Sequence, residues 1–181
     1  MEEYLIEFCA ATLAGLKPAS LFNYPFSNQA ELDGQLAGWN RRLSGKGVTL
    51  QVLRQSERAA LIYVCRPSHL QKTLFCPRVT AFLRRFGYVE GDVDGMLRRL
   101  RRRMQQGGFP HEIGLFLGYP LGDVAGFIRH GGKNCKCTGC WKVYVDESGA
   151  RACFARLDRC RCAYRRLWRQ GKSVWQLTVA A

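Results

Sequence analysis

Cysteines at metal-ligand spacing are the residues of this sequence best suited to chemistry. Cys135, Cys137 and Cys140 lie within residues 109–144, a stretch that also holds a His-Glu pair, spaced glycines and two prolines. Thiolates this close together can bind one soft metal ion, and tetrahedral zinc or an iron–sulfur cluster needs four such ligands. With Cys160 as the fourth ligand, the spacing predicts a zinc or iron–sulfur site.

Other roles for these cysteines stay open. Cys153 or Cys162 could supply the fourth ligand in place of Cys160. Cys153 and Cys160 lie seven residues apart on one face of a predicted helix, where a free cysteine commonly serves as a small core residue. A redox-active or redox-sensing thiol pair within residues 135–140 is a further alternative. Neighbouring ammonium groups would favour its thiolate form, and the sequence supplies Lys133, Lys136 and Lys142.

A cysteine–histidine enzyme is a separate hypothesis. His111 at the start of a predicted helix could act as a base, with Cys9 as the nucleophile and Asp123 or Glu112 orienting the imidazole. The zinc-protease motif that begins His-Glu is excluded, because position 115 is leucine where the second histidine is required. The alternative for His111 is local capping or packing at the helix start.

The chain is strongly basic. It carries 28 Lys and Arg against 14 Asp and Glu, a formal net charge of +14 in 181 residues, and seven of the 28 are lysines, which leaves 21 arginines. The arginines gather at 98–103 and 151–169. Because a guanidinium donates paired hydrogen bonds to phosphate or carboxylate, these segments predict a polyanion partner, such as nucleic acid or an acidic protein. The alternative is that they are solvated helix faces.

The compartment is predicted from the start of the chain and from its cysteines. The opening MEEYLIEFCA carries early acids, whereas a signal peptide needs a positive start and an unbroken apolar core. No apolar run is long enough to span a bilayer, so no membrane insertion is expected. We therefore expect a cytoplasmic protein whose nine cysteines are mainly reduced thiols.

Apolar periodicity predicts an α+β fold. Alternation at Val48, Leu50 and Val52 indicates a strand, and the polar turn after it leads to a second apolar run. The expected architecture is a small antiparallel or mixed sheet, with a hairpin at about 48–65 and a strand at about 141–145, packed with several helices as a single domain over 1–181. Helices are predicted over 4–13, 29–43, 68–86 with Ser68 as N-cap and Pro77 kinking or dividing it, 92–104, 110–117, 121–128 and 153–167. Residues 16–22 are expected to form a loop or a short strand.

Several blocks of the sequence resemble an uncharacterised bacterial family, a domain of unknown function found mainly in anaerobic Gram-positive bacteria. The resemblance is carried by HEIGLFLGYPLGDVAGFI at 111–128, by CWKVYVD at 140–146, by the block from Cys9 to Phe22 and by the closing segment 171–179. It spans almost the whole chain, which implies one domain. Such a family has no established activity, so it implies no catalytic residues.

The resemblance does imply which positions matter. It singles out Cys9, Lys17, Arg66, His111, Glu112, Cys135 and Cys160. Of these, Lys17 joins the catalytic candidates and Arg66 is the candidate for cofactor binding. Cys137 and Cys162 are departures from the family pattern, which weakens the four-ligand metal site.

Three functions are therefore predicted as alternatives. The first is binding of a soft metal or a redox cofactor through the cysteine cluster, with a redox partner protein. The second is a basic binding module for nucleic acid or an acidic protein, with structural cysteines. The third is a Cys/His-dependent enzyme.

Overall fold

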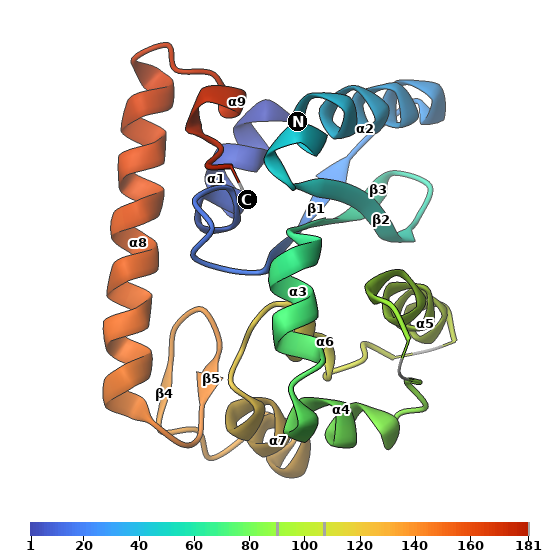
Figure 1. Ribbon diagram of the computed structural model, residues 1–181, viewed down its shortest axis with the longest axis vertical. Helices are drawn as coiled ribbons and strands as arrows, with labels where there is room; N and C mark the ends of the chain where they lie inside the picture. The colour runs from blue at the N-terminus through green and yellow to red at the C-terminus, as the bar shows by residue number, and fades with distance from the viewer. Residues whose placement is uncertain (90, 107, 181) are drawn as a thin grey trace.

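A three-stranded antiparallel sheet lies at the centre of the computed structural model, which describes residues 1–89, 91–106 and 108–180 (Figure 1). Its strands are β1 (Ala19–Pro25), β2 (Thr49–Gln55) and β3 (Ala59–Cys65), in the order β1-β3-β2. The hairpin predicted at 48–65 is confirmed as β2 and β3. The third strand comes from the segment at 16–22 that was expected to be a loop or a short strand.

Both faces of the sheet are buried, and alternate residues of β3 serve them. Ala60, Ile62 and Val64 belong to one apolar cluster, while Tyr63 and Cys65 belong to another. Successive side chains of a strand point to opposite faces, so the central strand divides the molecule into two cores. Groups that belong to different cores are therefore separated by the sheet.

Three helices cover the first face: α1 (Glu2–Leu13), α2 (Gln29–Leu43) and the short α9 (Val174–Leu177). Residues spaced by four, three and four along α2 all lie in this core: Leu32, Leu36, Trp39 and Leu43. Asn28 begins α2 by accepting a hydrogen bond from the Glu31 amide, and a short 3-10 turn, η1 (Ser44–Lys46), follows the helix.

Five helices contribute to the core on the second face. They are α3 (Pro67–Leu74), α4 (Pro77–Arg84), α5 (Val93–Gln105), α6 (Ile113–Phe116) and α7 (Leu121–His130). Of these, α4 and α7 lie at the end away from the sheet (Figure 1). Pro77 divides the segment 68–86 into two helices, because proline cannot donate within a helix interior. The predicted cap at Ser68 is wrong: Pro67 occupies the first turn and Arg66 precedes it. Asp92 begins α5, and its carboxylate accepts a hydrogen bond from the Gly95 amide.

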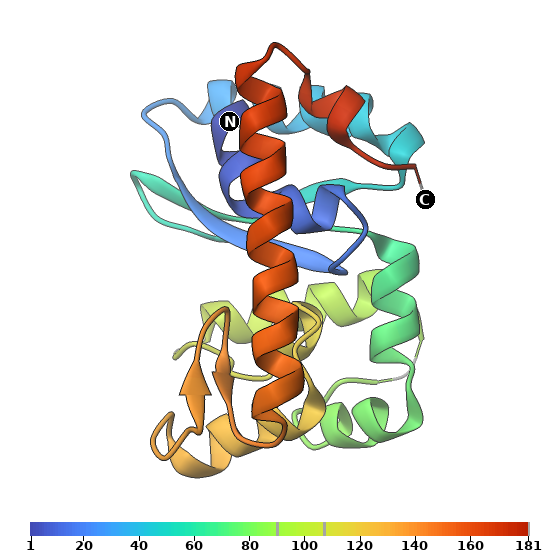
Figure 2. The ribbon, with the colours of Figure 1, turned by 90° about the vertical axis from the view of Figure 1, so that its left-hand side faces the viewer.

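The longest helix, α8 (Glu147–Arg169), runs along one side of the molecule past both cores (Figures 1 and 2). An ion pair between Arg165 and Glu7 ties it to α1. A hairpin of β4 (Cys137–Thr138) and β5 (Lys142–Val143) precedes it. The strand predicted at 141–145 therefore pairs in a separate two-stranded sheet and not with the central one. Throughout the described residues, no helix has the length and apolarity that crossing a membrane requires.

Candidate functional site: an aromatic pocket between α6, α7 and the β4–β5 hairpin

A cavity of about 390 Å³ opens between α6, α7 and the β4–β5 hairpin. Its walls are mainly aromatic and aliphatic, with four polar side chains among them: His111, Asp123, Thr138 and Lys142. The lining residues are Phe109, His111, Ile113, Gly114, Leu117, Tyr119, Asp123, Val124, Phe127, Thr138, Gly139, Trp141 and Lys142. A concave apolar site with a few polar groups is the usual form of a small-molecule pocket.

Two stacked rings form one wall of the pocket. The Tyr119 and Trp141 ring centroids are 5.0 Å apart at an interplanar angle of 28°. Trp141 also meets Phe154 of α8 edge to face at 4.6 Å. These contacts hold the indole between the pocket and α8, so the wall is fixed by packing from both sides.

Asp123 anchors the hairpin to α7. Its carboxylate is 3 % exposed and accepts hydrogen bonds from the Trp141 indole N–H at 2.7 Å, from the Tyr144 amide at 2.8 Å and from the Val145 amide at 3.0 Å. Asp123 was predicted as a group that could orient His111. The structure instead uses its carboxylate to position Trp141 in the pocket wall.

Close approach of the hairpin to α7 requires glycine on the helix. A Cβ on Gly126 would lie 2.5 Å from the Tyr144 ring, which is closer than real contacts allow. A Cβ on Gly114 would lie 2.7 Å from Val124 Cγ2 on the pocket wall. Both glycines are therefore required by close packing.

His111 lies at the edge of the cavity. Its ring centroid is 4.9 Å from that of Phe127 and 6.5 Å from that of Phe109. The imidazole is exposed, so it remains accessible to a ligand or to solvent. Lys142 also borders the cavity, and its ammonium donates to the Gly132 carbonyl at 2.7 Å.

Glu112 is fully engaged elsewhere. It is 1 % exposed, forms an ion pair with Arg103 and accepts a hydrogen bond from the Tyr88 hydroxyl at 3.1 Å. The hydrogen bond from Arg103 to Glu112 raises the pKa of that guanidinium. Burial, followed by the nearby Glu112 charge, raises the pKa of Tyr88. The carboxylate thus anchors α5 to the start of α6.

Cys9 and His111, predicted as a nucleophile and its base, are not brought together. The Cys9 thiol is buried in the core between α1 and the sheet. His111 borders the cavity on the opposite side of the sheet. Burial raises the pKa of Cys9, which disfavours the thiolate that nucleophilic attack needs. The Cys/His enzyme stays a prediction from the sequence.

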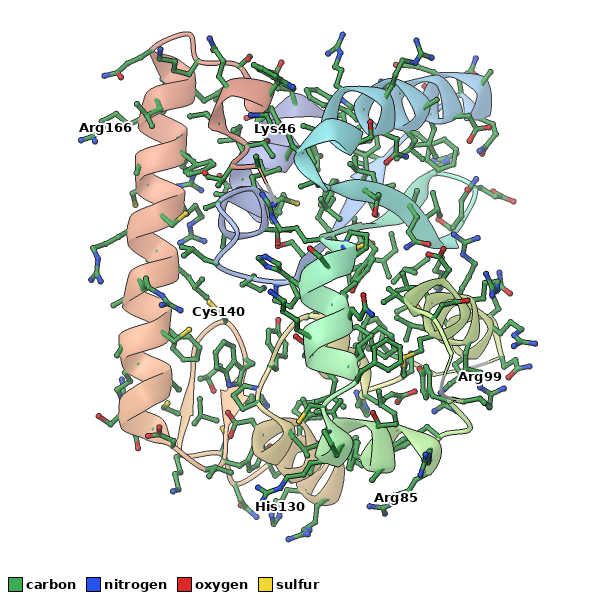
Figure 3. The ribbon with its side chains drawn as sticks, viewed as in Figure 1. Lys46, Arg85, Arg99, His130, Cys140 and Arg166 are labelled. Atoms are coloured by element: carbon green, nitrogen blue, oxygen red, sulfur yellow. The ribbon has the colours of Figure 1, made fainter. Side chains whose placement is uncertain are left out.

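Lys17 lies beside the pocket wall. Its ammonium is 5.4 Å from the centroid of the Tyr119 ring, and within the described residues it has no hydrogen bond or ion pair. Burial lowers the pKa of Lys17, while the thiols of Cys140, Cys9 and Cys153 act in the opposite direction. The structure thus places this predicted catalytic candidate next to Cys140, whose side chain lies between the hairpin and α8 (Figure 3).

Arg66, the predicted cofactor-binding residue, is surrounded by backbone carbonyls. Its side chain is 1 % exposed and donates to Thr12 O at 2.6 Å, Leu13 O at 2.6 Å, Val179 O at 2.7 Å and Lys46 O at 3.2 Å. These bonds occupy four of its five N–H groups. They join the end of α1 to the C-terminal segment, which is a structural role.

The four predicted metal ligands lie in different surroundings. Cys135 is 3.6 Å from the Thr138 hydroxyl, Cys137 belongs to β4, Cys140 is exposed between β4 and β5, and Cys160 is on α8. Among residues 1–89, 91–106 and 108–180, no group of three or more His, Cys, Asp or Glu side chains could hold a metal ion. The structure therefore gives the zinc or iron–sulfur site no support, and it stays a prediction.

The aromatic pocket is the feature that sequence reasoning missed. Its ring-bearing residues, Phe109, Tyr119, Phe127 and Trp141, come from separate loops, helices and a hairpin. The available signal was the density of aromatic and glycine residues in 109–144. Spacing alone could not show that these rings face one cavity.

Comparison with known proteins places the chain in a family without assigning it an activity. No curated protein matches the sequence, and no solved structure matches it either. A family model described as "Protein of unknown function (DUF3793)" matches residues 5–178. Because that match covers nearly the whole chain, this protein belongs to the DUF3793 family of proteins of unknown function.

Proposed function

We propose that this protein binds a planar, ring-containing small molecule in the aromatic pocket. The observation that carries the proposal is a cavity of about 390 Å³ with Phe109, Tyr119, Phe127 and Trp141 in its walls. Flat π-faces are matched best by another flat ring, because offset stacking and edge contacts add to the burial of apolar area.

The polar groups of the pocket indicate what such a ligand carries at its edge. The Asp123 carboxylate already accepts three hydrogen bonds, so it is a poor partner for a further donor. The Lys142 ammonium has one bond to a carbonyl, and His111 is exposed at the edge. We therefore assign to the ligand an anionic or acceptor substituent that Lys142 and His111 bind.

Planar redox cofactors fall within this ligand class. A redox cofactor bound in the aromatic pocket would not require the cysteines to lie close to one another. We also assign the protein to the cytoplasm, because its nine cysteines are unpaired and free thiols persist in a reducing compartment.

Titration with two probes tests the proposal: 8-anilinonaphthalene-1-sulfonate and flavin mononucleotide, each a planar ring system with an anionic group. Phe127→Ala removes one ring of the wall. Since an aromatic contact contributes about 1 kcal/mol, we expect probe affinity to fall about fivefold. Phe82→Ala is the matched control, because Phe82 is also a half-buried helical phenylalanine with a ring partner, Phe86, but lies outside the pocket.

Circular dichroism would establish that both variants are folded before the titrations are compared. Weaker binding by Phe127→Ala with unchanged binding by Phe82→Ala supports the pocket. The proposal is wrong if neither probe binds the wild-type protein, or if both variants bind as the wild type does.

Binding of a polyanion along α8 is a second candidate, favoured by the pairing of its arginines. Arg151, Arg161 and Arg165 form ion pairs with carboxylates. Four other arginines of the helix are exposed and form no such pair with any described residue: Arg156, Arg159, Arg166 and Arg169. Figure 3 shows Arg166 pointing away from the body of the protein.

A single-stranded oligothymidylate tests this candidate through the salt dependence of its binding. Replacing Arg156 and Arg159 with glutamine should lower the slope of log affinity against log salt by about 1.4, since each phosphate contact contributes about 0.7. Replacing Arg151 and Arg161 removes the same charge from residues that already have partners. Equal slopes for the two double variants would mean that binding depends only on the total charge of the protein. That result would exclude a specific binding face on α8.

A further inference from the structure

The β4–β5 turn is packed directly against α8. A Cβ on Gly139 would lie 2.2 Å from the Phe154 ring, so only glycine permits this approach. The next ring along the turn, Trp141, contacts the same Phe154 at 4.6 Å. Cys140 lies between these two contacts in the sequence, and Cys153 precedes Phe154 on the helix. The packing therefore places the two cysteines at one junction.

Exposure and charge at this junction differ between the two thiols. Cys140 is exposed, whereas Cys153 is half-buried on α8. Desolvation raises the pKa of the Cys140 thiol, the Lys17 ammonium opposes that shift, and Cys153 adds to it. Lys17 lacks a carboxylate partner among the described residues, so its charge is available to a thiolate.

We propose that Cys140 and Cys153 form a reversible dithiol–disulfide site, with the Lys17 ammonium stabilising the Cys140 thiolate. The oxidant is hydrogen peroxide. The Cys140 thiolate attacks one peroxide oxygen, the O–O bond breaks, and the leaving hydroxide takes up a proton, so the products are a sulfenic acid at Cys140 and water. The Cys153 sulfur then attacks the sulfenic sulfur, forming the S–S bond and releasing a second water.

The atoms and electrons of this sequence balance. Two thiols and one hydrogen peroxide give one disulfide and two waters, so the cysteines lose two electrons and the peroxide gains them. A dithiol reductant reverses the reaction. This site requires only two cysteines, unlike the predicted metal site, and it does not depend on the identity of the pocket ligand.

Peptide mapping after mild oxidation tests the pairing. Trypsin releases residues 137–142 and 152–156 as separate peptides, and Cys137→Ser leaves Cys140 as the only thiol of the first. After stoichiometric hydrogen peroxide and alkylation of the remaining thiols, we expect these two peptides to be joined in a form that a dithiol reductant separates. In Cys153→Ser, a dimedone adduct at Cys140 should replace the disulfide.

Oxidation rates test the role of Lys17. Lys17→Met should slow Cys140 oxidation at neutral pH by about threefold to tenfold, and Lys17→Arg should restore the rate. Lys133→Met is the control, since Lys133 is an exposed lysine outside the junction. Pairing of Cys140 with a cysteine other than Cys153, or oxidation of Cys140 to sulfinic acid without disulfide formation in the wild type, would refute the site. Equal rates in all variants would refute the role of Lys17.

Discussion

Replacing Arg66 with methionine should destabilise the protein more than any replacement of a surface arginine. Methionine fills part of the same volume but donates no hydrogen bond. The change removes three short bonds, from the guanidinium to Thr12 O, Leu13 O and Val179 O, and a longer one to Lys46 O. It leaves carbonyls at the end of α1 without a partner in a site that water does not reach easily.

The magnitude follows from two opposing contributions. Hydrogen bonds to a charged group contribute about 1.5–3 kcal/mol each, so the three short bonds give roughly 4–9 kcal/mol. Burial of the guanidinium costs several kcal/mol, which methionine avoids. We expect a net loss of about 3–4 kcal/mol, equivalent to a fall of roughly 6–16 °C in melting temperature for a chain of this length.

Urea denaturation followed by circular dichroism measures this loss. Arg156→Met is the control, because Arg156 is exposed and forms no ion pair with any described residue. The control should change the free energy of unfolding by less than about 0.5 kcal/mol. Faster hydrogen exchange should also appear at residues 174–180, since Arg66 holds the Val179 carbonyl and the Val179 amide bonds to Leu13 O. A loss below about 1 kcal/mol for Arg66→Met would contradict the role of Arg66 in joining α1 to the C-terminal segment.

Three further predictions concern buried polar groups. Asp123→Asn should cost about 2 kcal/mol, because an amide cannot accept all three hydrogen bonds, and it should change Trp141 fluorescence; an unchanged spectrum and stability would contradict the anchoring role. Glu112→Gln should lower the free energy of unfolding by about 1–3 kcal/mol in urea titrations, since it removes the ion pair with Arg103. Burial raises the pKa of Cys65 from 9.0 to about 11, so between these values the unfolded chain ionises and the folded one does not. Stability should therefore fall as pH rises through this window, and Cys65→Val should reduce the slope; identical slopes would contradict the assignment.

Local pattern was sufficient to predict most of the secondary structure. Alternation at Val48, Leu50 and Val52 specified β2, because one face of that strand packs on the core. The edge strand β1 was less visible, because Pro18 precedes it and Pro25 ends it, and proline at a strand end is tolerated only where no neighbour needs the N–H.

The candidate sites depended on contacts between distant segments. Cys9 and His111 looked like possible partners in the sequence, yet the central sheet separates them. The family resemblance suggested Arg66 as a cofactor-binding residue. In the structure its N–H groups donate to carbonyl oxygens of α1 and of the C-terminal segment.

The sequence by itself determined the α+β class, the main hairpin, most helices and the basic charge. It also showed that residues 109–144 are rich in glycine and aromatic residues. Tertiary structure alone decided that four aromatic rings face one cavity and that the hairpin turn at Gly139 and Trp141 packs on Phe154 of α8. The physical reason is that the periodicity of a helix or strand depends on residues a few positions apart. A site depends on packing between elements, and the number of residues between two elements does not tell how far apart they lie in space.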